Sequence, residues 1–180
     1  MINATVTAYT DYFRQLAVHQ VDLQHNPAGE TGDAPPGSVH FTRWSADEAI
    51  TGLRSKVSFP ALLLELYETN TSAEIEYDVR NSYLGAFSIV ASALPENFAS
   101  EMDAFSFAEK IMTDVLQKIW ADHYSGTDRC TTPFEFFNLN YSITPFGPIF
   151  DNQFGYRCEF NFNFRRDKKF NQPPATGTFI

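Results

Sequence analysis

Residues 134–164, FEFFNLNYSITPFGPIFDNQFGYRCEFNFNF, are the part of the chain most diagnostic of its structure. Apolar and polar side chains alternate with a period of two in residues 137–143 and again in residues 156–164. Successive side chains of a β-strand point to opposite faces, so each stretch predicts a long strand with one face on a core and one face in water. The predicted core faces comprise Phe137, Leu139, Tyr141 and Ile143 on the first strand, and Tyr156, Cys158, Phe160, Phe162 and Phe164 on the second.

The segment PFGPIFDNQFG, residues 145–155, connects these two predicted strands. It is too long for a tight turn, so we expect a hairpin with a protruding loop. Apolar side chains at the tip of such a loop have little reason to be exposed unless another surface covers them. The sequence therefore predicts an oligomer interface formed by Phe146, Ile149, Phe150 and Phe154, joined by Pro35 and Pro36 of an earlier loop.

Two earlier segments predict further strands. The nearly continuous apolar run VSFPALLLELY, residues 57–67, is typical of a strand covered on both faces, and we expect it at the centre of the sheet. Residues 74–93 begin with Ile75, Tyr77 and Val79 in alternation and continue as an apolar run. They predict one long strand bent near Gly85, or two abutting strands.

Two amphipathic helices are predicted from apolar residues spaced three and four apart. The first covers residues 2–23, and the second covers residues 100–123 with Ser100 as its N-cap and Gly126 at its end. We expect Phe160 and Phe162 to face the second helix. The apolar stripes comprise Val6, Tyr9, Phe13 and Leu16 on the first helix, and Phe105, Ala108, Met112, Val115, Leu116 and Ile119 on the second.

The remaining segments are rich in proline and glycine. Residues 24–39, QHNPAGETGDAPPGSV, predict an exposed, mobile loop that serves a partner. Ser45 and Glu48 have the spacing of a capping box and predict a short helix. The sequence thus predicts a single α+β domain over residues 1–170 and an extended tail over 171–180. Its mostly antiparallel sheet of about four long strands carries the amphipathic helices on one face.

Composition excludes several classes of function. Of 180 residues, 22 are acidic and 13 basic, and the net charge of -9 argues against a surface that neutralises a phosphate backbone. The one basic cluster, residues 165–169, is interpreted as a solvated strand end. No apolar run approaches the roughly 20 residues that span a bilayer, and no secretory signal pattern is present, so we expect a soluble protein made in the cytoplasm.

No familiar catalytic pattern is present, since HExxH, GxSxG, GxxxxGK and GxGxxG are all missing. The alternating Glu74, Glu76 and Asp78 favour a wet strand face, with divalent-ion binding as the open alternative. The sequence therefore predicts a protein that is not an enzyme, with no catalytic residue, no cofactor and no metal. Residues interpreted as surface or structural are His19, His25, His40 and His123, and those interpreted as incidental thiols are Cys130 and Cys158.

The order of elements resembles the tail-terminator and tail-completion proteins at the neck of long-tailed bacteriophages. The resemblance covers roughly residues 45–165 and rests on FPALLLEL, the amphipathic helix that follows, and the closing hairpin. It implies a non-enzymatic α+β subunit of the virion, assembled in the bacterial host cytoplasm. Such subunits form closed, usually hexameric rings between the tail tube and the head connector, through which DNA passes without specific binding.

A second hypothesis is a small pocket-bearing ligand-binding or enzyme domain of the cone type. In that arrangement a curved sheet folds over a helix and encloses a pocket. We expect Tyr141, Tyr156 and Trp120 to line it.

Overall fold

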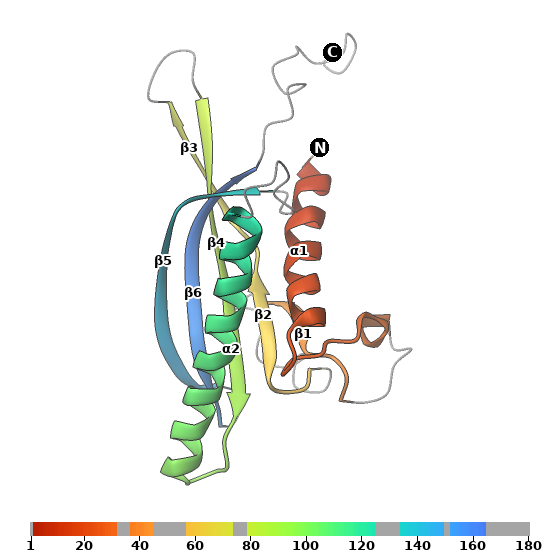
Figure 1. Cartoon of the computed structure of the whole chain (residues 1–180), viewed down its shortest axis with the longest axis vertical. Helices are drawn as coiled ribbons and strands as arrows, with labels where there is room; N and C mark the ends of the chain where they lie inside the picture. The colour runs from red at the N-terminus through yellow and green to blue at the C-terminus, as the bar shows by residue number, and fades with distance from the viewer. Residues whose placement is uncertain are drawn as a thin grey trace.

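The structure is a computed structural model that describes residues 2–31, 37–44, 57–73, 79–124, 134–149 and 152–164. The elements of these residues follow in chain order in Figure 1. They are α1 (Ile2–His19), the 3-10 helix η1 (Pro27–Thr31), β1 (Phe41–Trp44), β2 (Ala61–Glu65), β3 (Glu68–Ala73), β4 (Val79–Ser92), α2 (Phe98–Tyr124), β5 (Phe134–Ile149) and β6 (Gln153–Phe164).

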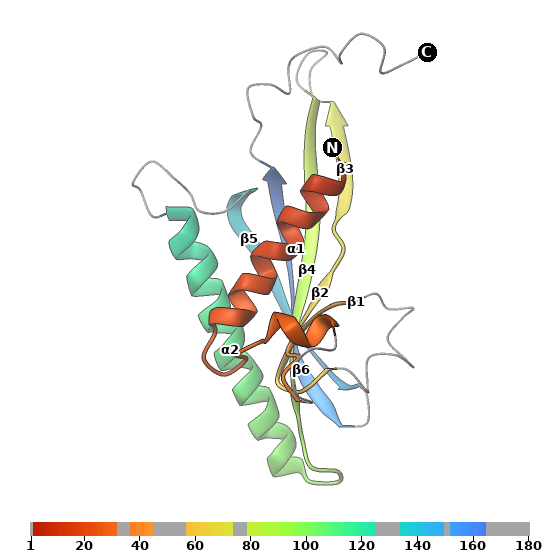
Figure 2. The same ribbon diagram turned by 90° about the vertical axis from the view of Figure 1, so that its right-hand side faces the viewer.

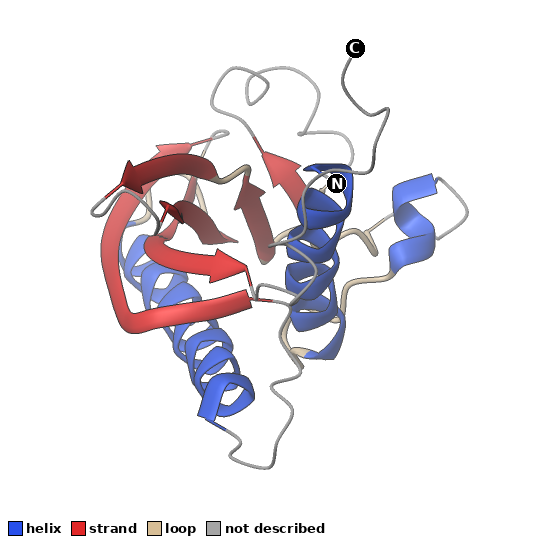
Figure 3. Ribbon diagram, turned by 90° about the horizontal axis from the view of Figure 1, so that it is seen from above, coloured by secondary structure: helices blue, strands red, loops and turns tan. Residues whose placement is uncertain are grey.

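The described strands form one mixed sheet in the order β1-β2-β4-β6-β5, and β3 also pairs with β4. Only β1 and β2 run parallel within it, so the predicted α+β class with a mostly antiparallel sheet is confirmed. The sheet has six strands rather than about four. The two strands that sequence reasoning missed are β1, which has four residues, and β3, whose polar sequence ETNTSA shows no apolar alternation. Figure 3 shows how strongly the sheet curves.

The centre of the sheet is β4, which pairs with β3 and then β2 along one edge and with β6 along the other. It is one continuous strand in the described range. The predicted buried strand corresponds to β2, whose residues from Ala61 to Leu64 are buried on both faces. Its position next to β1 places it inside the sheet but one strand from the centre.

Both helices cover the same face of the sheet, as predicted and as Figure 2 shows. The main core lies between them and this face, and the apolar stripes of both helices contribute to it. Phe160 and Phe162 do share the core face, but their ring contacts include Tyr9 and Phe13 of α1. Aromatic contacts of α2 with β6 include those of Phe105 with Phe154 and Tyr156 at the start of the strand.

The N-cap of α2 is Asn97 rather than Ser100. The Asn97 side-chain oxygen accepts the backbone N–H of Ser100 at 3.1 Å, which satisfies a donor that the first helical turn leaves unpaired. The Ser100 hydroxyl instead accepts the backbone N–H of Leu94 at 2.8 Å. The helix therefore begins two residues earlier than predicted, and the predicted end at Gly126 lies outside the described residues.

The prediction of a protruding hairpin loop is wrong. Pairing between β5 and β6 continues to Ile149 and Gln153, with an irregularity after Phe146. Pro145 and Pro148 can occur in β5 because it is an edge strand. A proline has no N–H, but on the side of β5 that has no neighbouring strand no hydrogen bond is lost.

The predicted core face of β5 is exposed at Tyr141 and Ile143, and the side chains of Phe137 and Leu139 lie outside the described residues. Tyr141 and Ile143 are 44% and 41% exposed, although they pair with the buried Phe160 and Cys158 of β6. The physical reason is the position of α2, which packs mainly on β4 and β6 and leaves the edge strand beyond the helix layer. Figure 1 shows β5 on the far side of β6 from β4.

Residues 24–39 were predicted to form a mobile loop, but the described part of this segment is held in place by hydrogen bonds. The side chain of His25 is buried, its Nδ1 accepts the backbone N–H of His40 at 3.2 Å, and its Nε2–H donates to Glu30 at 2.9 Å. Glu30 also accepts two hydrogen bonds from Arg14 of α1, at 2.7 and 3.1 Å. These contacts hold η1 and the start of β1 against α1.

Stability is expected to fall on mild acidification because of His25. Burial lowers the pKa of this imidazole, even though Glu30 acts in the opposite direction. Below the ordinary His pKa of 6.5 the unfolded chain therefore binds more protons than the folded one, and stability falls as pH decreases through that range. Denaturant unfolding between about pH 5 and 8 measures this slope. The variant His25→Gln should have a shallower slope, and an unchanged slope would contradict the assignment.

Candidate functional site

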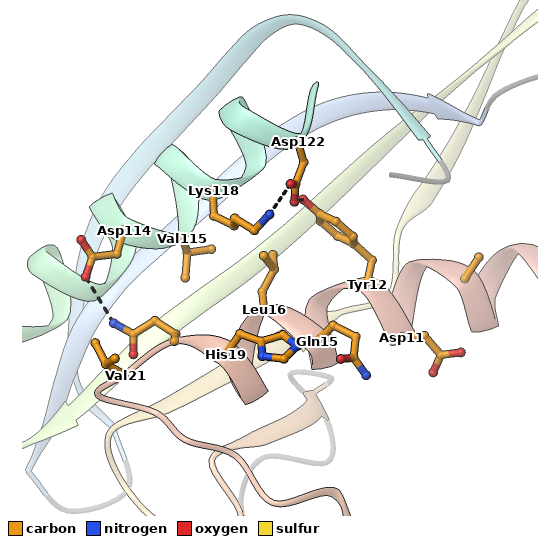
Figure 4. A pocket seen from close by; sticks show the side chains of 12 residues that line it. Asp11, Tyr12, Gln15, Leu16, His19, Val21, Asp114, Val115, Lys118 and Asp122 are labelled. Carbon is orange, nitrogen blue, oxygen red and sulfur yellow. Dashed lines mark hydrogen bonds and ion pairs between the residues drawn. The ribbon is translucent and has the colours of Figure 1, made fainter. Parts of the chain in front are cut away.

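A cavity of about 730 Å³ lies between α1 and α2. We call it the interhelical groove, and Figure 4 shows it from close by. Its lining comprises Ala8, Asp11, Tyr12, Gln15, Leu16, His19, Gln20 and Val21 on the side of α1, and Asp114, Val115, Lys118 and Asp122 on α2.

Helix periodicity places these residues along facing sides of the two helices. Side chains three or four positions apart lie on one side of an α-helix, which aligns Ala8, Tyr12 and Leu16 along α1. The same spacing aligns Asp114, Lys118 and Asp122 along α2. The floor of the groove is apolar, because Leu16 and Val115 are both buried in the main core.

One end of the groove is bridged at Asp122. The Tyr12 hydroxyl donates to the Asp122 carboxylate at 3.1 Å, and Lys118 forms an ion pair with the same carboxylate (Figure 4). Asp122 is buried, whereas the side chain of Lys118 is mostly exposed. The bridge therefore joins α1 to the last turns of α2 through a carboxylate that retains a charged partner.

The other end is bridged at Gln20. Its side-chain amide donates to Asp114 at 3.3 Å and to Asp22 at 3.2 Å, and its carbonyl oxygen accepts the backbone N–H of Asp22 at 2.7 Å. Lys110 of α2 forms an ion pair with Asp22 at 2.8 Å. The hydrogen bond from Lys110, assisted by the one from Gln20, lowers the pKa of the Asp22 carboxyl. The chain leaving α1 is thus fixed to the middle of α2.

The charge of the lining is acidic. The lining contains three carboxylates, those of Asp11, Asp114 and Asp122, and one ammonium group, that of Lys118. Lys118 is engaged by Asp122, and Arg14, which pairs with Asp11, also pairs with Glu30. The groove therefore combines an apolar floor with a polar rim in which Asp11 and Asp122 already have cationic partners, Arg14 and Lys118.

Of the three histidines whose side chains are described, His25 and His40 are in contact, since His25 Nδ1 accepts the backbone N–H of His40, whereas His19 lies at the groove. His19 is exposed at the groove, His25 is buried beside Glu30, and the Nδ1 atom of His40 lies 2.7 Å from the carbonyl oxygen of Pro60. The side chain of His123 lies outside the described residues, as do all residues from 74 to 78 with their three acidic side chains.

Within the described ranges no group of three or more His, Cys, Asp or Glu side chains is placed to hold a metal ion. Cys158 is a buried thiol, and burial raises its pKa to about 12, so it is a poor nucleophile at neutral pH. Cys130 lies outside the described residues.

The predicted interface residues are scattered. Phe154 is buried in the main core because β6 already begins at Gln153 and its alternation turns Phe154 inward. Phe146 and Ile149 pack against a smaller cluster on the opposite face of the sheet, which contains Leu63 and Val90. Phe150, Pro35 and Pro36 lie outside the described residues, and the interface itself stays a prediction.

Sequence reasoning missed the groove. The pocket predicted for the second hypothesis was expected to be lined by Tyr141, Tyr156 and Trp120, none of which lines the interhelical groove. The sequence feature that could have indicated the groove is the polar side of α2, where Asp114, Lys118 and Asp122 recur every four residues. That spacing shows that the three residues share one side of α2, but it does not show that α1 faces this side.

Comparison with protein-family models gave no match, and comparison with curated proteins gave none either. None of the described helices is long and apolar enough to cross a membrane.

Proposed function

We propose that the protein is a non-enzymatic structural subunit of a bacteriophage or phage-tail-like particle and forms a ring at the tail end or the head–tail neck. The observation that carries this proposal is the edge strand β5. It has sixteen residues, pairs with β6 alone in the described part of the chain, and leaves Tyr141 and Ile143 exposed.

A long edge strand offers unpaired backbone groups to another chain. Natural proteins usually shield such edges with charges or prolines. The described stretch from Asn140 to Ile149 has no charge, and its prolines, Pro145 and Pro148, come only after Thr144. A contact between this edge and a different surface of the next copy is heterologous, and repetition of such a contact around an axis closes a ring. The proposed partners are further copies of the chain, most simply six, together with tail-tube and head-connector proteins in the virion.

The acidic composition fits passage of DNA through such a ring. The net charge of -9 repels the phosphate backbone, which allows DNA to move through the bore without specific binding. Assembly would take place in the host cytoplasm.

The variant Ile143→Asp is expected to fold normally and to fail in assembly. Ile143 is partly exposed, so a carboxylate there remains hydrated in the monomer but would be desolvated under a neighbouring subunit. Electron microscopy and crosslinking of native particles measure ring incorporation, and circular dichroism checks the fold. The control is Thr144→Asp, which places the same charge on the opposite face of β5. Native particles that contain no ring of this chain would refute the proposal.

The second candidate function is a pocket-bearing ligand-binding or enzyme domain, and the interhelical groove favours it. A volume of about 730 Å³ lies within the range of small-molecule sites. A broad screen for hydrolase activity and ligand binding on pure protein tests it. Turnover that is lost in Asp122→Asn and Lys118→Met would support this candidate over the structural role.

A further inference from the structure

We propose that the edge strand β5 pairs with strand β1 of the next copy of the chain, so that the sheet continues from one subunit into its neighbour. This inference rests on the proposed ring and names the surface of the neighbour that receives β5. In the described part of the chain β1 is the other outer strand of the path β1-β2-β4-β6-β5, and Figure 1 shows β1 and β5 on opposite sides of the sheet.

The two outer strands run in opposite directions. β1 is parallel to β2, and each of the following pairs, β2 with β4, β4 with β6 and β6 with β5, is antiparallel. Rotation about an axis parallel to the strands leaves their directions unchanged. A ring of this kind therefore brings β5 of one copy beside β1 of the next in the antiparallel orientation, in which opposite residues can exchange N–H···O bonds.

The register places both edges at the same height. One row of paired residues crosses the whole sheet, and its members are Arg43, Leu64, Phe87, Cys158 and Ile143. Paired residues share a face, so Arg43 and Ile143 both belong to the face that the helices cover. Rotation without a shift along the strands places Ile143 of one copy next to Arg43 of the following copy.

Both edges expose apolar side chains that this contact covers. Those on the side of β5 are Phe98, Met102 and Trp120 of α2, with Tyr141 and Ile143 of β5. Helix spacing puts the three α2 residues on the side of Phe105, whose ring contacts Tyr156 of β6. At the other edge Leu66, which directly follows the last β2 residue paired with β1, is 56% exposed. Contact between the two edges removes apolar surface from water in both copies.

The charges of the two edges are complementary. Arg43 is the charged residue of β1, and it is exposed. A charge on an outer strand usually prevents pairing with another chain, so the receiving surface has to supply the opposite charge. The exposed Glu109 does so from α2, because it lies one helical turn after Phe105 on the same side of the helix.

Glu109 also lies at the height of Ile143. α2 and β6 run side by side in the same direction (Figure 1), and one helical turn of about 5.4 Å corresponds to about two strand residues. Phe105 contacts Tyr156, and two residues further along β6 Cys158 pairs with Ile143. The guanidinium group of β1 can therefore pass over Ile143 and bind this carboxylate in the neighbouring copy, which leaves Ile143 in an apolar contact.

The experiment is disulfide crosslinking of the full chain, with Cys130→Ser as the background. The row next to that of Arg43 and Ile143 begins at Thr42 and ends at Thr144. Opposite residues of antiparallel strands have Cβ atoms about 4.5–5.5 Å apart, close enough for a disulfide after a small adjustment. On oxidation at about 1 mM protein, we expect Thr42→Cys/Thr144→Cys to give a ladder of covalent oligomers beyond the dimer on a non-reducing gel.

The two single-cysteine variants are the controls. A contact between β5 and β1 joins two different residues, so Thr42→Cys or Thr144→Cys alone should give at most about a tenth of the crosslinked yield. Efficient dimer formation by Thr144→Cys alone would show two β5 strands paired across a two-fold axis, and would overturn the proposal. Circular dichroism confirms that each variant is folded.

Charge reversal tests the register. In the double-cysteine chain, Arg43→Glu and Glu109→Arg should each weaken association about tenfold, and their combination should restore it because opposite charges meet again. Association that neither single reversal changes would mean that the edges do not meet in this register, and would overturn the pairing.

The same variants in native particles separate this pairing from the ring itself. A ring of this chain without the crosslink between Thr42 and Thr144 would overturn the pairing and leave the proposed function intact. A ladder in solution from a chain that no native particle contains would support the pairing and refute the role in a virion. A ladder that forms only in particles supports both, whereas its absence from particles and from solution overturns the pairing.

Discussion

Replacement of Phe162 by alanine is expected to lower the free energy of unfolding by about 3–5 kcal/mol, the usual cost of emptying a buried aromatic site. Its side chain is fully buried, and its ring centroid lies 5.2 Å from that of Tyr9 and 5.5 Å from that of Tyr83. It therefore joins α1 to the centre of the sheet. Denaturant unfolding at neutral pH measures the effect.

The matched control is Tyr141→Ala on the neighbouring strand. Tyr141 lies on the same face of the sheet as Phe162 but is nearly half exposed, so its loss should cost less than about 1 kcal/mol in the monomer. A cost for Phe162→Ala below that of Tyr141→Ala would mean that the register of β6 is shifted by one residue, because such a shift exchanges the two faces of the strand.

Replacement of Gly155 by alanine is expected to destabilise the fold by about 3 kcal/mol or more, because the new methyl group meets backbone. A Cβ atom at this position would lie 1.9 Å from the carbonyl oxygen of Ile89 on β4. Two paired strands at the centre of the sheet cannot separate there without loss of ladder hydrogen bonds. Thermal and denaturant unfolding measure the change.

Gly85→Ala provides the comparison. A Cβ atom there would lie 2.8 Å from the ring of Phe160 and from the Tyr9 hydroxyl, both of which belong to side chains. Side chains can shift by a few tenths of an ångström more readily than a paired strand, so Gly85→Ala should cost less than Gly155→Ala. The reverse order would show that β4 and β6 adjust more easily than the aromatic core.

Much of the fold follows from periodicity that each segment carries by itself. The period of two in residues 156–164 predicted β6 and placed Phe160 and Phe162 on its core face, and the apolar stripe of residues 100–123 predicted α2. These predictions succeed because the direction of a side chain within one helix or strand depends only on local backbone geometry. Local capping chemistry was less decisive, since both Asn97 and Ser100 suit an N-cap.

The interhelical groove could not be predicted in this way. Tyr12 and Asp122 are 110 positions apart in the chain, and their hydrogen bond depends on how α1 and α2 are placed on the sheet. Arg157 likewise reaches across β4 to bind Glu65 through two hydrogen bonds, at 2.6 and 2.8 Å. It can do so because β4 presents the small residues Ala86 and Ser88 between them.

Patterns within the sequence are enough to assign the class of the fold, the two amphipathic helices and the buried faces of β2 and β6. The exposure of Tyr141 and Ile143, the burial of Phe154 and the groove between the helices depend instead on tertiary packing. The physical reason is that burial depends on which element covers a face. A strand at the edge of the sheet has the same alternation as a strand inside it, and only the position of α2 leaves the face of β5 open.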